Sequence, residues 1–161
     1  MRVAAALLGL LLCGAAAAGD EIAVIVAKDA PDLQIGAAML RDIYLKKIFI
    51  DAHGRAFIPV NLPPDNPLRH ALTGALFNKS TQQLQDYWNQ RYFQGISPPY
   101  VLHSQDAVVQ FVAKTPGAIG YIDPCHLDSH VKQVLSISAP PSQHEELERL
   151  CPPLTAPASN Q

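Results

Sequence analysis

The sequence predicts an α/β fold, a three-layer sandwich in which helices cover a mostly parallel sheet. Residues Glu21 to Ala27 (EIAVIVA) are almost continuously apolar and rich in β-branched side chains. Such a run is typical of a strand buried on both faces. Strand and helix patterns then alternate along the chain as far as residue 137. This alternation favours largely parallel strands joined by helices.

The helices are predicted from the spacing of their apolar residues and from their start signals. Between residues 35 and 46, the apolar residues Ile35, Met39 and Ile43 share one helical face. Three later helices begin at recognisable positions: Pro67 in a first turn, Ser80 as the cap of a capping box with Gln83, and Ser104 as a cap. The helix after Ser80 carries an aromatic stripe that we expect to pack in the core: Tyr87, Trp88, Tyr92 and Phe93.

The remaining strands are expected at 57–62, 100–103, 118–122 and 131–137. Pro59 lies inside the first of these segments and cannot donate a ladder hydrogen bond. We therefore expect that strand to be short or to lie at an edge of the sheet.

The chain divides into three parts. Arg2, the apolar run from Val3 to Leu12 and the small residues Ala16 to Ala18 indicate a signal peptide over residues 1–18. The alternative is a retained anchor, although the run is shorter than the roughly 20 residues that a membrane span needs. Residues 19–138 form the predicted domain. From 139 to 161 the chain is rich in Pro, Ser and charge, which predicts disorder apart from a short helix over 143–150.

Two cysteines remain after the signal peptide, Cys125 and Cys151. In an oxidising compartment they could form one disulfide, and the alternative is two free thiols. His126, Asp128 and His130 lie near Cys125, but without a second ligand cluster this loop predicts no metal site.

Four segments resemble the phosphate-type substrate-binding proteins of ABC transporters, and in particular their short, single-lobe relatives. They are EIAVIVAKD (21–29), LRDIYLKK (40–47), IPVNLP (58–63) and PGAIGYI (116–122). The resemblance covers residues 21–137 and implies one lobe of a periplasmic-binding-protein fold that recognises a small oxyanion such as phosphate. In full-length members, two lobes hold the ligand between them. The stretch 62–68 (LPPDNPL) lacks the arginine, the glycine pair and the hydroxyl residues of the family's phosphate loop.

Candidate ligand-binding residues follow from the ends of the predicted strands and the starts of the predicted helices. Helix N-termini attract anions, and ligands of open α/β sheets gather at the carboxyl ends of the strands. The candidates are Lys28, Asp29, Asn66, Leu68, Arg69 and Ser104. The alternatives are a helix cap at Asn66, a solvated Arg69, a charged loop at Lys28 and Asp29, and a cap at Ser104.

The composition excludes several function classes. The formal net charge is −2, which gives no reason to expect nucleic acid or an anionic membrane as a partner. No catalytic motif is present, so we expect no enzyme and no cofactor. The sequence predicts an exported, periplasmic or secreted binding module, without a membrane span in its mature part, for a transporter or an envelope sensor. The alternative is an interaction domain that has lost its ligand site.

Overall fold

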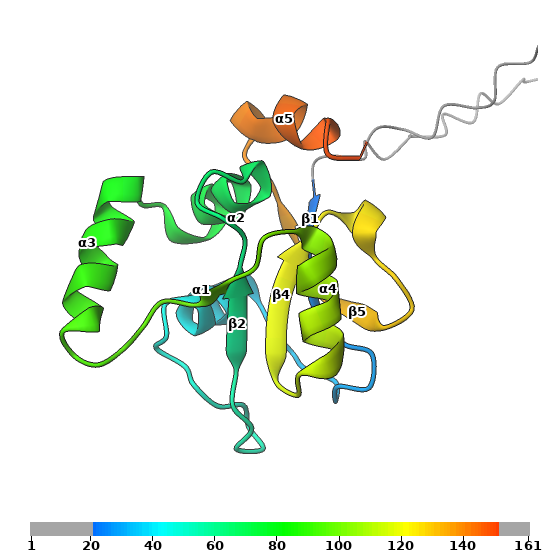
Figure 1. The fold of residues 1–161 in the computed structure, drawn as a ribbon, viewed down its shortest axis with the longest axis horizontal. Coiled ribbons are helices and arrows are strands. Elements are labelled where there is room, and N and C mark those ends of the chain that lie inside the picture. Colours follow the sequence, from blue (N-terminus) through cyan, green and yellow to red (C-terminus); the bar gives the residue numbers. More distant parts are fainter. Residues whose placement is uncertain (1–20, 152–161) are drawn as a thin grey trace, which may run out of the picture.

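A computed structural model describes residues 21–151 of the chain. Its centre is a five-stranded sheet in the order β3-β2-β4-β1-β5 (Figure 1). The strands are β1 (Glu21–Ala27), β2 (Ile58–Asn61), β3 (Tyr100–Val101), β4 (Ala118–Ile122) and β5 (Val131–Ser138). The predicted signal peptide at 1–18 and residues 152–161 lie outside the described residues. Between residues 21 and 151, no helix is both long and apolar enough to cross a membrane.

Four of these strands run in one direction and β1 runs in the other. β2 is parallel to β3 and to β4, whereas β1 is antiparallel to β4 and to β5. The predicted α/β class with a mostly parallel sheet is therefore confirmed. Because β1 is reversed, the carboxyl end of β1 lies at the opposite edge of the sheet from the carboxyl ends of β2, β3 and β4.

The helices are α1 (Ala37–Tyr44), α2 (Pro67–Phe77), α3 (Thr81–Tyr92), α4 (Gln105–Lys114) and the short α5 (His144–Glu148). The contacts of two neighbouring residues of β4 show which helix covers each face of the sheet. A Cβ on Gly120 would meet Val108 and Val112 of α4. The ring of Tyr121 instead lies 6.0 Å from that of Tyr44 in α1. Successive residues of a strand point to opposite faces, so α4 covers one face and α1 covers the other.

The core is built around β1, as its composition predicts. Residues Ile22 to Val26 are at most 2% exposed, and they are covered on both faces of the sheet. Burying each large aliphatic side chain stabilises the fold by about 1.5–3 kcal/mol. Pro59 lies in β2, which is short but internal. Only Val60 and Asn61 of β2 pair with β3, so within the described part of the chain Pro59 has no strand partner on that side.

The helix start signals are confirmed. Asn66 caps α2 with Pro67 in its first turn, Ser80 and Gln83 form a capping box at α3, and Ser104 caps α4. The expectation for the aromatic stripe of α3 is wrong. None of residues 82–92 is buried, and Tyr92 and Phe93 are 67% and 89% exposed. In Figure 1, α3 stands to one side of the sheet, where no second layer of residues 21–151 covers it.

The chain stays packed beyond residue 138, where the sequence predicted the domain to end. Ala139 and Leu147 are 5% and 1% exposed and belong to the hydrophobic core. The 3-10 helix η2 (Pro141–Gln143) leads into α5, which is shorter than the helix predicted over 143–150. The apolar side chain of Leu147 lets this Pro-rich segment pack above α2 and the sheet (Figure 1).

Candidate functional site

The structure separates the predicted site residues into two groups. Asn66, Leu68 and Arg69 follow β2, and Ser104 follows β3, so these four lie at the same edge of the sheet. Lys28 and Asp29 follow β1 and lie at the opposite edge, because β1 is reversed. The two groups of candidates therefore do not lie at one edge of the sheet. A strand's direction depends on its partners, which its own residues do not specify.

At the start of α2, the cap leaves little for an anion to bind. The Oδ1 of Asn66 accepts the Leu68 N–H at 3.0 Å, and Pro67 has no N–H. The side chain of Leu68 is fully buried, so it belongs to the core. Ser104 likewise accepts the Ala107 N–H at 3.1 Å. Asn66 and Ser104 thus act as helix caps, which was the alternative interpretation of each.

Arg69 takes part in a partly buried polar network. Its Nη1 donates to the carbonyl of Leu62 at 2.7 Å, and burial lowers the pKa of its guanidinium. The Leu62 N–H donates to the Tyr121 hydroxyl at 3.2 Å, and that hydroxyl donates to Asn61 Oδ1 at 2.5 Å. Burial raises the pKa of Tyr121 far above its ordinary value, partly offset by the Leu62 hydrogen bond and by the charge of Arg69. Tyr121 therefore stays neutral, and the network holds the end of β2 in place.

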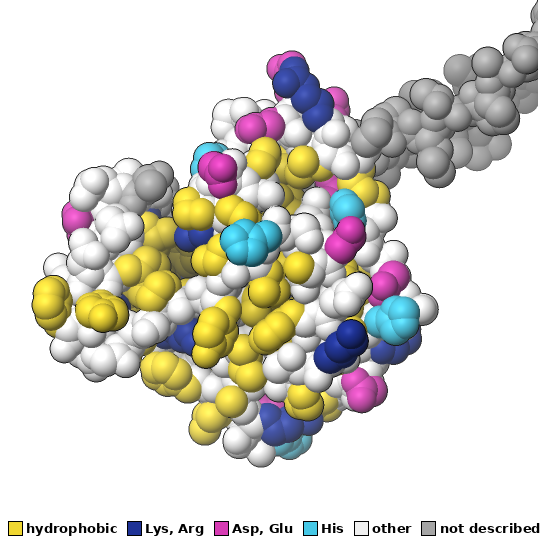
Figure 2. Space-filling view, viewed as in Figure 1, with side chains coloured by type: hydrophobic (Ala, Val, Ile, Leu, Met, Phe, Trp, Pro, Cys, Tyr) yellow, Lys and Arg dark blue, Asp and Glu magenta, His cyan; other side chains and the backbone are white. Residues whose placement is uncertain are grey.

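Beside this network, a hollow of about 480 Å³ opens between α2 and the start of α3. It is lined by polar, basic and apolar residues: Pro64, Arg69, His70, Thr73, Gly74, Lys79, Ser80, Leu84 and Gln143. No carboxylate is among these described lining residues. Figure 2 shows a hollow between α3 and the rest of the molecule. The surroundings are basic, and they contain two hydroxyl groups.

Sequence reasoning identified Arg69 but missed His70, Thr73 and Lys79. Arg69 and Thr73 are four residues apart and so share one face of α2. That spacing could have suggested a polar face. Lys79 lies in the turn between α2 and α3, and its position depends on the angle at which α3 leaves α2, which no local pattern specifies.

The opposite edge carries charges of both signs. A cavity of about 510 Å³ is lined by Lys28, Asp29, Lys114, Asp128 and His130, among others. A second cavity, of about 280 Å³, contains the ion pair between Asp51 and Arg55, with an N–O distance of 2.7 Å. Desolvation opposes the shift, but hydrogen bonds from Arg55 and His53 and the charge of Arg55 lower the pKa of Asp51 to about 2. At this edge acidic groups accompany the basic ones, so it suits an anion less well than the hollow does.

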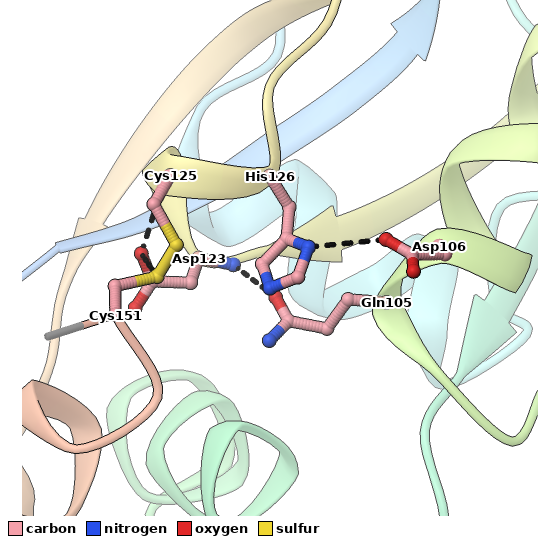
Figure 3. Close-up of a disulfide and its surroundings, with 6 residues drawn as sticks. All are labelled: Gln105, Asp106, Asp123, Cys125, His126 and Cys151. Atoms are coloured by element: carbon pink, nitrogen blue, oxygen red, sulfur yellow. Dashed lines mark hydrogen bonds and ion pairs between the residues drawn. A yellow bond between two sulfur atoms is a disulfide. The ribbon is translucent and has the colours of Figure 1, made fainter.

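The two cysteines meet beside the 3-10 helix η1 (Pro124–His126). Cys125 and Cys151 form a disulfide, with 6.2 Å between their Cα atoms (Figure 3). It joins the C-terminal segment, residues 139–151, to η1, which directly follows β4. Asp128 and His130 pair with each other at 3.1 Å.

The chain thus forms one α/β lobe, in which β1 is reversed within an otherwise parallel sheet, helices lie on both faces and a polar cluster lies at the end of β2. Solved structures of transport proteins share this fold. The chain is similar to a putative phosphate ABC transporter substrate-binding protein with bound phosphate from Clostridium perfringens, with a TM-score of 0.59 and 20% identity over 71% of this chain. It also resembles an ABC-type phosphate transport receptor from Vibrio cholerae, with a TM-score of 0.58 and 15% identity over 74%.

A third similar structure is PstS from Borrelia burgdorferi, with a TM-score of 0.50 and 18% identity over 64% of this chain. The chain spans about half the length of these proteins, since the matches cover 44%, 55% and 40% of them. No family model matches the sequence, and no curated protein matches it significantly. At these identities the likeness establishes the fold, as the resemblance of the sequence segments implied.

Proposed function

We propose that the protein is an exported solute-binding module that holds a small oxyanion, with inorganic phosphate as the first candidate, for an ABC-type transporter. The observation that carries this proposal is the basic hollow at the end of β2. It brings Arg69, His70 and Lys79 together without a carboxylate in its described lining. The phosphate bound in the structurally similar Clostridium protein supports the choice of ligand. The signal-like residues 1–18 and the disulfide support export to an oxidising compartment.

The side chains of the hollow have donors to offer. A guanidinium has five N–H donors, and the Arg69–Leu62 bond uses one of them. Lys79 is exposed at the rim and adds a second cation. The Ser80 hydroxyl accepts the Gln83 N–H, so its own proton remains available. Gln143 also lines the hollow, and its buried Oε1 has no hydrogen-bond partner among the described residues. A protonated oxyanion such as hydrogen phosphate could donate to such an acceptor.

Isothermal titration of the mature protein with inorganic phosphate tests the proposal. Lys79→Ala should weaken binding by about tenfold, because a charged hydrogen bond contributes about 1.5 kcal/mol or more. Lys114→Ala is the matched control: it removes an exposed lysine at the opposite edge and should leave the affinity unchanged. If phosphate and sulfate give no heat with folded protein, the ligand assignment is wrong. If Lys114→Ala weakens binding and Lys79→Ala does not, the site is at the other edge.

A second candidate function is a protein-interaction domain without a ligand. The observation that favours it is the exposure of Tyr92 and Phe93 at the end of α3. A stoichiometric envelope partner that is retained without phosphate, and lost with Phe93→Ser, would support this second function over the first.

A further inference from the structure

Four side chains able to bind a metal converge where η1 meets the end of the C-terminal segment (Figure 3). One ligand atom each from Cys125, His126 and Cys151 lies within 4.8 Å of the other two. Asp123, which is 3% exposed and caps η1, places its Oδ1 2.9 Å from the sulfur of Cys151. These residues come from two segments that the fold brings together across 26 positions of sequence.

The orientation of His126 suits a metal ligand. Its Nδ1 lies 3.1 Å from the Oδ1 of Asp106 on α4, and a carboxylate at this position accepts a proton from Nδ1. That tautomer leaves the lone pair of Nε2 free. Figure 3 shows Nε2 on the side of the ring nearer the two cysteines. Histidines that bind metals commonly donate their other ring N–H to a carboxylate in this way.

The geometry of the cluster is also compatible with Cys125 and Cys151 in their reduced, thiol form. Two-electron reduction by a dithiol breaks the S–S bond and gives two thiols, while the reductant forms its own disulfide. Cys125 is exposed, so a reductant can reach it. A disulfide sulfur has no proton to give to Asp123 Oδ1, whereas a Cys151 thiol at 2.9 Å could donate one. The Asp123 carboxylate can therefore accept a hydrogen bond from Cys151 once the disulfide is reduced.

We propose that the reduced protein binds one Zn²⁺ through Cys125, Cys151, His126 and Asp123, and that the disulfide and the zinc site exclude each other. Two thiolates, an imidazole and a carboxylate make a four-coordinate donor set that zinc accepts and that magnesium and calcium disfavour. Binding releases the two thiol protons to solvent. Zinc would then replace the disulfide as the link between the segment 139–151 and the sheet.

Zinc titration of the full mature protein against a chromophoric chelator, after reduction with a phosphine and its removal, tests the site. The reduced protein should bind one zinc ion, and the oxidised protein none. His126→Ala should weaken the binding by at least tenfold. Asp106→Asn should weaken zinc binding by about 10–100-fold, because the Asp106 carboxylate orients His126. The matched control is His130→Ala, since His130 has the same 3.1 Å contact with an aspartate but lies outside the cluster.

Two readouts keep the test decisive if reduction loosens the fold. Cobalt substituted for zinc should give thiolate charge-transfer absorption, which reports sulfur ligation directly. Asp106 lies 20 residues from His126 in the sequence, so an effect of Asp106→Asn requires the folded arrangement. The proposal is overturned if the reduced protein binds no zinc, if the oxidised protein binds it equally well, or if His126→Ala and His130→Ala have the same effect.

Discussion

Tyr121 links the sheet to the start of α2 through its hydroxyl. It accepts the Leu62 N–H and donates to Asn61, while Arg69 holds the Leu62 carbonyl. Tyr44 lies beside it and donates to the Val60 carbonyl at 2.9 Å. Both phenols are buried, and burial raises the pKa of each above the ordinary value of 10.0; the neighbouring Tyr121 adds to the effect at Tyr44. The network requires both groups to stay protonated.

This network predicts a loss of stability in alkali. Below about pH 10 both phenols are protonated in the folded and the unfolded protein, and the stability is fully present. Above about pH 10 the unfolded chain loses these protons while the folded protein keeps them. The free energy of unfolding should therefore fall by up to about 2.7 kcal/mol per pH unit, or about 1.36 for each phenol. Urea unfolding at a series of pH values measures this slope.

Single substitutions assign that slope to residues. Tyr121→Phe should roughly halve it, and it should also lower the stability below pH 10, because the Leu62 N–H loses its partner at a cost of about 1–3 kcal/mol. Tyr92→Phe removes a phenol that is 67% exposed and should change neither quantity. An unchanged slope in Tyr121→Phe would show that other groups cause the alkaline loss.

At the scale of elements, the C-terminal segment contributes to the core far more than its composition indicates. Leu147 is 1% exposed in a helix of five residues, and α5 packs beside α2. We expect Leu147→Ala to lower the free energy of unfolding by about 2–4 kcal/mol. Leu127→Ala, at a site that is 37% exposed, is the matched control and should cost much less. Equal effects in thermal or urea unfolding would mean that the segment does not stabilise the domain.

Most elements could be predicted from local patterns, and the exceptions have a common cause. The apolar run of β1, the Pro67 start of α2 and the capping box at Ser80 are encoded within a few residues. The packing of 139–151 depends on Leu147 meeting the core and on a disulfide to Cys125. The exposure of α3 depends on the absence of a covering layer among the described residues. Such long-range relations leave no periodic signal in a single sequence.

At the scale of the whole molecule, long-range relations also determine which parts of the site could be predicted from the sequence. Arg69 could be found because a helix start after a strand is a local feature. The edge at which Lys28 and Asp29 lie could not be predicted, because the direction of β1 is set by its pairing with β4 and β5. The hollow beside α2 needs both the α2–α3 turn and Gln143 of η2, which are more than 60 residues apart. A sequence pattern can suggest which residues belong to such a site, but it does not show that they lie close together in the fold.

Stability should be unevenly distributed over the fold, and hydrogen exchange can measure this. β1 lies between β4 and β5, and its residues 22–26 are fully enclosed. Its amides should exchange only through global unfolding, with rates that rise steeply with urea. α3 has no buried residue in 82–92. Its described contacts include the hydrogen bonds from Tyr87 to the Leu45 carbonyl, at 2.6 Å, and from Arg91 to the Lys46 carbonyl, at 2.9 Å.

We therefore expect α3 amides to exchange through local opening that is nearly independent of urea, while the sheet stays intact. Tyr87→Phe removes one of the two tethers and should speed exchange in α3 several-fold without changing β1. Leu147→Ala, which acts on the core, should instead speed exchange in β1. If α3 is as protected as β1, or if Tyr87→Phe speeds both elements equally, then α3 unfolds with the sheet as one cooperative unit.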